Sequence, residues 1–224
     1  MKVFCSWSGG KDSCLSCYKA MLEGHEVDYL FTMFTTTGRH TRSHRLSKEL
    51  LLAQSQAIGI PVYNRRASWN TYEREFNKAL AVFKGQGIQG GVFGDLYLDG
   101  HREWVEKVCT VPGITPFLPL WGLEGKDLLW QFVEAGFEAV VIAVKGGVLG
   151  ADWLGRKIDK ELINELSNEA VDICGEQGEY HTLVIDGPIF RKKIEIIDTK
   201  VTRRNGMSFL EVLDFKLEEK GEDR

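Results

Sequence analysis

From Lys2 to Trp121 the sequence alternates between short apolar runs and longer amphipathic stretches, and this alternation constrains the fold more than any other feature. Each apolar run has the length of one strand, and each amphipathic stretch has apolar residues at helical spacing. Strands that alternate with helices of this length are typical of parallel βαβ units. We therefore predict an α/β domain with a parallel sheet, with strands at 2–7, 27–34, 61–65, 90–95 and 114–121 and helices at 13–24, 44–60, 69–87 and 101–109.

The second part of the chain has a different pattern, which predicts a smaller α+β domain. Asn205-Gly206 separates two long runs of alternating polarity, a strong signal for a tight hairpin. The boundary is expected between Pro119 and Gly125, and we divide the chain into domains 1–122 and 123–224. The predicted helices of the second domain are 126–137 and 159–170, and its predicted strands are 138–144, 171–174, 181–187, 192–204 and 207–218.

Composition excludes several classes of protein. The formal net charge of −4 gives no general electrostatic case for binding nucleic acid or membranes. No apolar run approaches the roughly 18 residues of a membrane-spanning helix, and the first residues do not resemble a signal peptide. The five scattered cysteines favour reduced thiols, so we expect a cytoplasmic protein.

A glycine-bearing turn at Ser8-Gly9-Gly10-Lys11-Asp12-Ser13 is the first candidate site. Because it follows a strand and precedes a helix, its backbone N–H groups can approach an anion closely. The hydroxyls of Ser8 and Ser13 can add hydrogen bonds, and Lys11 can add a point charge. The alternative is an ordinary turn in which Ser and Asp cap the helix. The pattern is neither the common GxxxxGK[ST] loop nor the dinucleotide-binding GxGxxG.

Two further groups of residues are candidates for chemistry. Asp95 follows the fourth predicted strand, and ligands of open α/β sheets bind beyond the carboxyl ends of the strands. Arg102, a few residues later, could contact phosphate or a carboxylate. Glu176 and Glu179 flank Gly178 in the second domain, where two carboxylates could bind ammonium or a cationic substrate, or act as a base. The alternative for this pair is an exposed acidic turn.

The motif SGGKDS at Ser8 to Ser13 resembles the PP-loop of the ATP pyrophosphatases. The resemblance implies a Rossmann-like ATP-binding domain in which this loop holds the β- and γ-phosphates of ATP. Those phosphates leave as pyrophosphate, and the α-phosphorus adenylates the substrate. Charge logic then gives Asp12 a role as a Mg²⁺ ligand. The adenine is expected near Thr32 to Phe34, with Met33 at its centre, held largely by backbone groups.

Motifs in order along the whole chain narrow this resemblance. SGGKDS, GDLYLDGHREWVEKVC, PLWGLEGKDLL, WLGRKID and CGEQGEYHTLVIDGPIF follow one another, and together the chain resembles the diphthine–ammonia ligase family from Lys2 to about Glu218. Members commonly have glycine in place of Gln177, which is a mild departure at a position we do not expect to be catalytic.

The resemblance implies a reaction and its partners. ATP would adenylate the carboxylate of diphthine on elongation factor 2, and ammonia would then displace AMP to give the amide diphthamide. The expected cofactors are ATP and Mg²⁺, and the expected catalytic residues are Asp95, Arg102, Glu176 and Glu179. Diphthine carries a trimethylammonio group that suits aromatic and acidic contacts. His44, Trp104 and Tyr180 are the expected substrate contacts.

Two alternatives stay open at this point. A related enzyme could adenylate another substrate, such as a tRNA base, and the basic stretch GRHTRSHR from Gly38 to Arg45 keeps an RNA substrate open. The acidic net charge argues against it. A non-enzymatic module that senses nucleotides is the second alternative. A homodimer is among the assemblies that the expectation allows.

Overall fold

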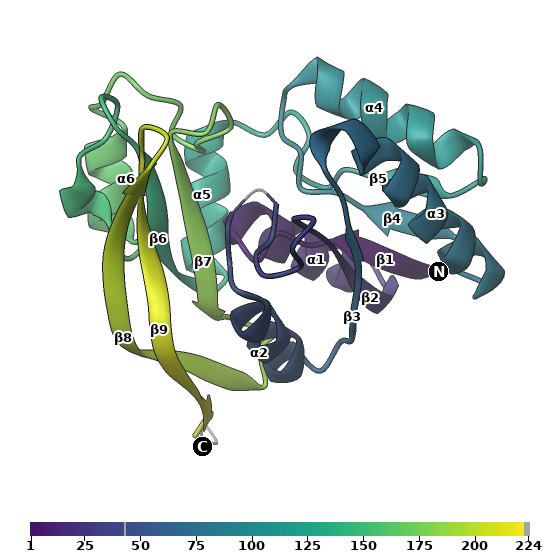
Figure 1. Cartoon of the computed structure of the whole chain (residues 1–224), viewed down its shortest axis with the longest axis horizontal. Helices are drawn as coiled ribbons and strands as arrows, with labels where there is room; N and C mark the ends of the chain where they lie inside the picture. The colour runs from purple at the N-terminus through teal and green to yellow at the C-terminus, as the bar shows by residue number, and fades with distance from the viewer. Residues whose placement is uncertain (43, 222–224) are drawn as a thin grey trace. The chain divides into compact units, whose positions relative to one another are not determined.

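The structure is a computed structural model, and it describes residues 1–42 and 44–221. The chain forms two compact units (Figure 1). The N-terminal unit comprises Met1–Ser8, Asp12–Gln56 and Ile60–Gly122. The C-terminal unit comprises Leu123–Arg224 together with two short segments, Gly9–Lys11 and Ala57–Gly59.

The N-terminal unit contains a five-stranded parallel sheet in the order β3-β2-β1-β4-β5. This arrangement confirms the α/β fold predicted from the alternating pattern. Its strands are β1 (Lys2–Ser6), β2 (Glu26–Phe34), β3 (Val62–Arg66), β4 (Gly90–Val92) and β5 (Thr115–Phe117). The helices that connect them are α1 (Lys11–Leu22), α2 (Lys48–Ile58), α3 (Tyr72–Gly85) and α4 (Asp99–Thr110), with a 3₁₀ turn η1 (Trp69–Thr71) before α3.

Helices cover both faces of this sheet. On one face, α3 and α4 pack on an aromatic core in which the ring of Phe4 stacks on that of Phe83 at 4.8 Å between centroids. On the other face, Trp7 donates its indole N–H to Gln54 of α2 at 3.1 Å, and Cys5 lies against the start of α1. Gly91 on β4 is required by the aromatic face, because a Cβ there would come within 2.5 Å of the Phe4 ring.

The C-terminal unit is α+β, as predicted. Its four-stranded antiparallel sheet has the order β7-β6-β9-β8. Asn205 and Gly206 both have positive φ, 51° and 76°, and form the tight turn of the long β8–β9 hairpin. The elements are α5 (Gly125–Glu134), β6 (Glu138–Lys145), η2 (Ala151–Trp153), α6 (Lys160–Leu166), β7 (Tyr180–Asp186), β8 (Lys192–Arg204) and β9 (Met207–Glu219).

Several predicted elements differ from the structure in their bounds, and for two of them a side-chain hydrogen bond gives the local reason. The strand predicted at 171–174 is wrong, because the Asp172 carboxylate accepts from the Cys174 N–H at 2.8 Å and bends the chain into a turn. The helix predicted from residue 44 begins only at Lys48, where the Ser47 hydroxyl accepts from Leu50 N at the helix start. The helix predicted to reach residue 170 ends at Leu166.

Neither unit contains a membrane-spanning helix among the residues described: none of the helices there is long and apolar enough. All five cysteines are free and buried. Burial raises the pKa of Cys5 and Cys14 well above the ordinary value, so these thiols stay protonated and unreactive in the native state.

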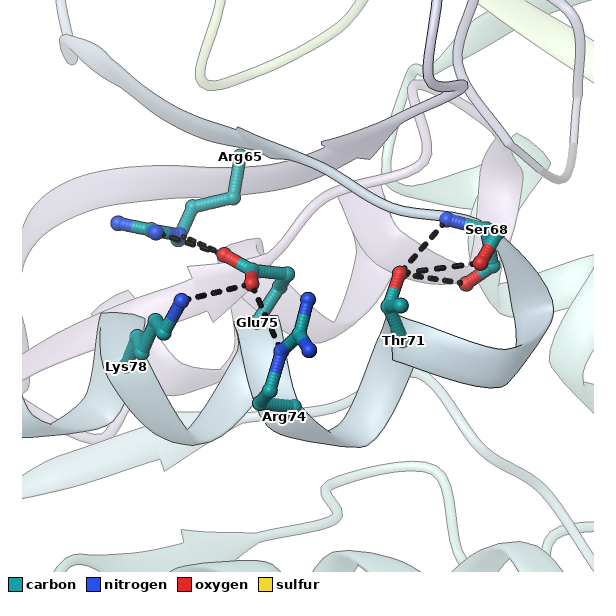
Figure 2. Close-up of polar contacts among 6 residues, drawn as sticks. All are labelled: Arg65, Ser68, Thr71, Arg74, Glu75 and Lys78. Atoms are coloured by element: carbon teal, nitrogen blue, oxygen red, sulfur yellow. Dashed lines mark hydrogen bonds and ion pairs between the residues drawn. The ribbon is translucent and has the colours of Figure 1, made fainter.

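A buried carboxylate joins β3 to α3 in the N-terminal unit (Figure 2). Glu75 is 7% exposed, and Arg65 on β3 donates to its Oε2 from Nε at 3.1 Å and from a terminal nitrogen at 2.7 Å. Lys78 and Arg74 donate to Oε1 at 2.9 and 3.2 Å. Just before α3, Ser68 and Thr71 form a capping box. These contacts fix the angle at which the chain leaves β3 and enters α3.

Glu75→Gln should destabilise the protein at neutral pH, because it leaves three cations without their carboxylate. The hydrogen bonds from Lys78 and Arg65 lower the pKa of Glu75 from 4.5 to about 2. Since the folded-state pKa is below the unfolded one, this contribution is complete above the unfolded pKa and is lost as pH falls towards about 2. Thermal unfolding followed by circular dichroism at a series of pH values measures both effects.

Exposed Glu103 on α4 supplies the matched control, and Glu103→Gln should leave the melting temperature nearly unchanged. The melting temperatures of wild type and Glu75→Gln should converge on acidification. A difference that stays constant down to about pH 2 would contradict the role assigned to Glu75.

Candidate active site

The carboxyl ends of β1 and β4 lie side by side at the centre of the parallel sheet. The strand order runs outwards from β1 through β2 and β3 on one side and from β4 to β5 on the other. Such a reversal in strand order is where open α/β sheets bind their ligands. The loops that follow these two strands carry Ser8 to Ser13 and Asp95.

The glycine pair lies between β1 and α1, where the sequence predicted a turn. Gly9 has a φ of 83°, a conformation that favours glycine, and α1 begins at Lys11. The hydroxyls of Ser8 and Ser13 are 3.1 Å apart and share a hydrogen bond. The first N–H groups of α1 have no partner within the helix, which makes the helix start suited to an anion such as phosphate.

The loop after β4 packs directly on the start of α1. A Cβ at Gly94 would lie 3.0 Å from the backbone carbon of Asp12 and 3.1 Å from Ser13 N, so glycine permits this approach. The next residue, Asp95, is half-buried, and its carboxylate lies 3.1 Å from Nδ1 of His101 on α4. Asp95 therefore stands beside the helix start that the motif provides.

Burial raises the pKa of Asp95 above its ordinary value, and the negative charge of Asp12 adds to this rise, while His101 opposes it. Asp12 and Asp95 are thus close enough to repel one another. A cation placed between them would relieve this repulsion. No group of three or more potential metal-ligating side chains occurs among the residues described. Mg²⁺ needs no such group, because one or two carboxylates together with phosphate oxygens and waters commonly hold it.

The other predicted residues of the N-terminal unit are engaged within the protein. Arg102 is exposed on α4, where its Nε donates to Glu106 at 2.7 Å. Trp104 donates its indole N–H to Glu73 at 3.1 Å, and its ring packs on Phe76.

Two predicted residues lie on or just beyond β2. Met33 is buried on β2, and its carbonyl accepts from Arg42 N at 3.0 Å. His44 is half-buried in the loop between β2 and α2.

The acidic turn of the C-terminal unit, residues 172–180, leads into β7. Glu179 is 7% exposed, and its carboxylate accepts from Gln177 N at 3.1 Å, so this side chain helps to build the turn. Glu176 is half-buried. Tyr180 donates its hydroxyl to the Ile173 carbonyl at 2.6 Å. The two predicted carboxylates therefore differ, with Glu179 the more buried.

Three residues of the motif, Gly9–Lys11, belong to the C-terminal unit by their contacts. The Gly9 carbonyl accepts from Val184 N at 3.0 Å, and Lys11 N donates to the Thr182 hydroxyl at 3.0 Å. The Lys11 ammonium, expected to add charge for phosphate, donates to the Cys174 carbonyl at 2.5 Å. This tip of the loop therefore packs on β7 and on the acidic turn.

The sequence analysis singled out neither Thr182 nor His101. Thr182 is buried on β7, and its hydroxyl accepts a hydrogen bond from Lys11 N. Nothing in the sequence around Thr182 indicates this contact, because Lys11 is 171 residues away in the chain. His101 carries a signal that could have been used, because it lies in the first turn of α4 and six residues after Asp95.

Comparisons with known proteins identify the same family in both halves of the chain. A family model described as the diphthamide synthase N-terminal domain matches residues 1–116, and one described as the diphthamide synthase C-terminal domain matches residues 124–215. Several relatives named diphthine–ammonia ligase are similar over most of their length. The relative from Bos taurus is 26% identical over 98% of this chain and 94% of its own, and that from Danio rerio is 30% identical over 90% and 88%.

A solved structure from Methanocaldococcus jannaschii, described as a predicted subunit of a tRNA methyltransferase, is also similar. It has a TM-score of 0.47 and 17% identity over 84% of this chain and 98% of its own. A likeness of this strength carries no argument about function.

Gly94→Ala should lower turnover on the order of tenfold, because the new Cβ forces the backbone of Asp12 and Ser13 to move by a few tenths of an ångström. The measurement is steady-state kinetics at varied ATP concentration. Gly100→Ala is the matched control, since a Cβ there meets nothing within 4 Å. If Gly94→Ala behaves like Gly100→Ala, the packing of the β4 loop on the start of α1 does not matter for the reaction.

Proposed function

This chain belongs to the diphthamide synthase family, and from that premise we propose that it is an ATP-dependent diphthine–ammonia ligase. The observation that carries the proposal is the match of both family domains, one to residues 1–116 and one to residues 124–215. ATP is the nucleotide substrate that membership implies. The runner-up, adenylation of a tRNA base, finds no support among the relatives described above, which are all named diphthine–ammonia ligase.

The reaction has two steps, and both balance with ATP and ammonia alone. An oxygen of the substrate carboxylate attacks the α-phosphorus, and the bond from that phosphorus to the bridging oxygen breaks, releasing pyrophosphate. Ammonia then attacks the acyl carbon, the bond from that carbon to the AMP oxygen breaks, AMP leaves, and the nitrogen gives up one proton. The first step is needed because a carboxylate is a poor electrophile, whereas its mixed anhydride with AMP is a good one.

We assign phosphate binding to the turn from Ser8 to Ser13. The N–H groups at the start of α1 and the Ser8 and Ser13 hydroxyls would hold the β- and γ-phosphates, which leaves the α-phosphorus open to attack. Asp12 and Asp95 would hold Mg²⁺, which would neutralise phosphate charge. We place the adenine near the carboxyl end of β2, around Met33.

We assign the residues that bind the substrate by the exposure of their side chains. Exposed Arg102 is proposed to bind the substrate carboxylate, because its pairing with Glu106 is a surface ion pair that exchanges at little cost. Glu176 is proposed to receive ammonium and take its protons, while buried Glu179 maintains the turn. Trp104 already uses its N–H within the protein, so we assign only its ring face to the trimethylammonio group. Tyr180 is buried with Lys11 over its ring, so we propose that it serves the substrate by shaping the acidic turn.

We propose elongation factor 2 carrying diphthine as the protein substrate, with free ammonium as the nitrogen source. His44 is assigned a substrate contact in the basic loop after β2. Because the reaction acts on a translation factor, we place the enzyme in the cytoplasm, and the five free cysteines are consistent with that compartment. A homodimer remains part of the proposal.

Incubation with ATP, ammonium and diphthine-bearing elongation factor 2 should convert the carboxylate to the amide, with one AMP and one pyrophosphate formed per amide. Intact mass spectrometry measures the amide, and chromatography of the nucleotides measures AMP. Stoichiometric ADP would exclude the PP-loop mechanism. Turnover of ATP to AMP that does not depend on the elongation factor would exclude this acceptor.

Glu176→Gln should spare ATP binding and lower amide formation on the order of a hundredfold, because the amide cannot take a proton from ammonium. ATP affinity from calorimetry and amide yield from mass spectrometry separate the two effects. Glu169→Gln, at an exposed position after α6, is the control. If Glu176→Gln forms amide as fast as this control, the residue has no catalytic part and the acidic turn is only structural.

A further inference from the structure

We propose that Lys11 is a positioning residue whose ammonium ties the phosphate-binding loop to the acidic turn that carries Glu176 and Glu179. The tie itself rests on contacts within the C-terminal unit, which includes both segments. Its consequence for catalysis rests on the proposed function. The role differs from the phosphate contact expected for a lysine in a phosphate-binding loop.

The burial of the Lys11 side chain supports this role. Lys11 is 3% exposed, its Nζ donates to the Cys174 carbonyl at 2.5 Å, and it lies 5.2 Å from the centre of the Tyr180 ring. Removing an ammonium from water is costly unless hydrogen bonds and nearby electron density compensate for it. A lysine whose task was to meet phosphate from solution would not need this enclosure.

The backbone of the loop is held at the same place. Val184 N donates to the Gly9 carbonyl, and Lys11 N donates to the Thr182 hydroxyl, each at 3.0 Å. The loop tip therefore packs along β7. The side chain of Lys11 extends from this segment to Cys174, just before β7 begins at Tyr180.

The turn is organised around the carbonyl that Lys11 contacts. Asp172 accepts from Cys174 N at 2.8 Å, and Tyr180 reaches back to the Ile173 carbonyl at 2.6 Å. Lys145 N donates to the Glu179 carbonyl at 2.8 Å and closes the other end. Lys11 thus links the phosphate-binding loop to the Cys174 carbonyl within this turn. Without it, Glu176 would keep its chemistry but lose its fixed position.

His181 provides an independent reporter of the Lys11 charge. Burial, and then the positive charge of Lys11, lower the pKa of His181 to about 4. Removing that charge should raise this pKa while burial still keeps it below the ordinary value. The chain has five histidines, so the ring protons can be assigned and titrated by NMR.

The test compares Lys11→Met, which keeps length and removes charge, with Lys200→Met at an exposed position on β8. For Lys11→Met we expect ATP affinity within about threefold of wild type and kcat for amide formation lower on the order of a hundredfold, as misplaced groups cause. Alkylation of Cys174, mapped by mass spectrometry, should accelerate, while Cys5 and Cys14 stay protected. Lys200→Met should change none of these.

Thr182→Val is the second variant, for the case in which Lys11→Met does not fold. This substitution removes only the hydroxyl that accepts a hydrogen bond from Lys11 N. It should change kcat and the alkylation rate of Cys174 in the same direction as Lys11→Met, but by a smaller factor. The proposal is overturned if Lys11→Met raises the KM for ATP with kcat unchanged, since Lys11 would then serve phosphate. It is also overturned if Cys174 stays protected, or the pKa of His181 stays constant, in Lys11→Met.

These readouts separate the tie from the proposed function. If wild type forms no amide but Cys174 is exposed in Lys11→Met, the ligase proposal fails and the tie stands. If wild type forms amide and Lys11→Met matches it with Cys174 protected, the tie fails and the ligase proposal stands.

Discussion

The close approach of the β4 loop to the start of α1 is the constraint on which the N-terminal unit depends. Gly94 lies so near the backbone of Asp12 and Ser13 that any side chain there would displace it. This approach brings the Asp95 carboxylate beside the start of α1, a helix N-terminus of the kind that suits an anion, so a carboxylate and a helix start lie in one small region. A nucleotide with bound Mg²⁺, as in the proposed mechanism, would present both kinds of charge.

The sequence was sufficient for the fold because the alternating pattern is local. Each apolar run of the N-terminal unit became a strand or part of one, and the Asn205-Gly206 hairpin formed where predicted. Errors in the predicted elements arose where a side chain accepted a hydrogen bond from the backbone N–H of a residue two or three positions later. Asp172 converted a predicted strand into a turn, and Ser47 set a later start for α2. Periodicity does not report such bonds, because they depend on one oxygen and not on a face.

The site was predictable in part for a related reason. The turn at Gly9 and the position of Asp95 follow from strand ends, which a sequence indicates well. The packing of Lys11 on Cys174 and Thr182 joins positions more than 160 residues apart, 163 and 171 respectively. No spacing rule links such positions. From the sequence, a lysine in a glycine loop is therefore expected to use its charge for phosphate. The burial of Lys11 is visible only in the structure.

The division of charge within the loop has a chemical logic of its own. A lysine bound to the leaving pyrophosphate would stabilise it both before and after the reaction, which lowers KM more than it raises kcat. Neutral N–H groups and hydroxyls hold phosphate without a full charge, so product can leave more readily. Lys11, enclosed by Cys174 and Tyr180, can instead hold the acidic turn in one shape throughout the cycle. In the proposed mechanism the cationic charge at the phosphates would come instead from a metal ion held by Asp12 and Asp95, which would make these two carboxylates the more consequential pair.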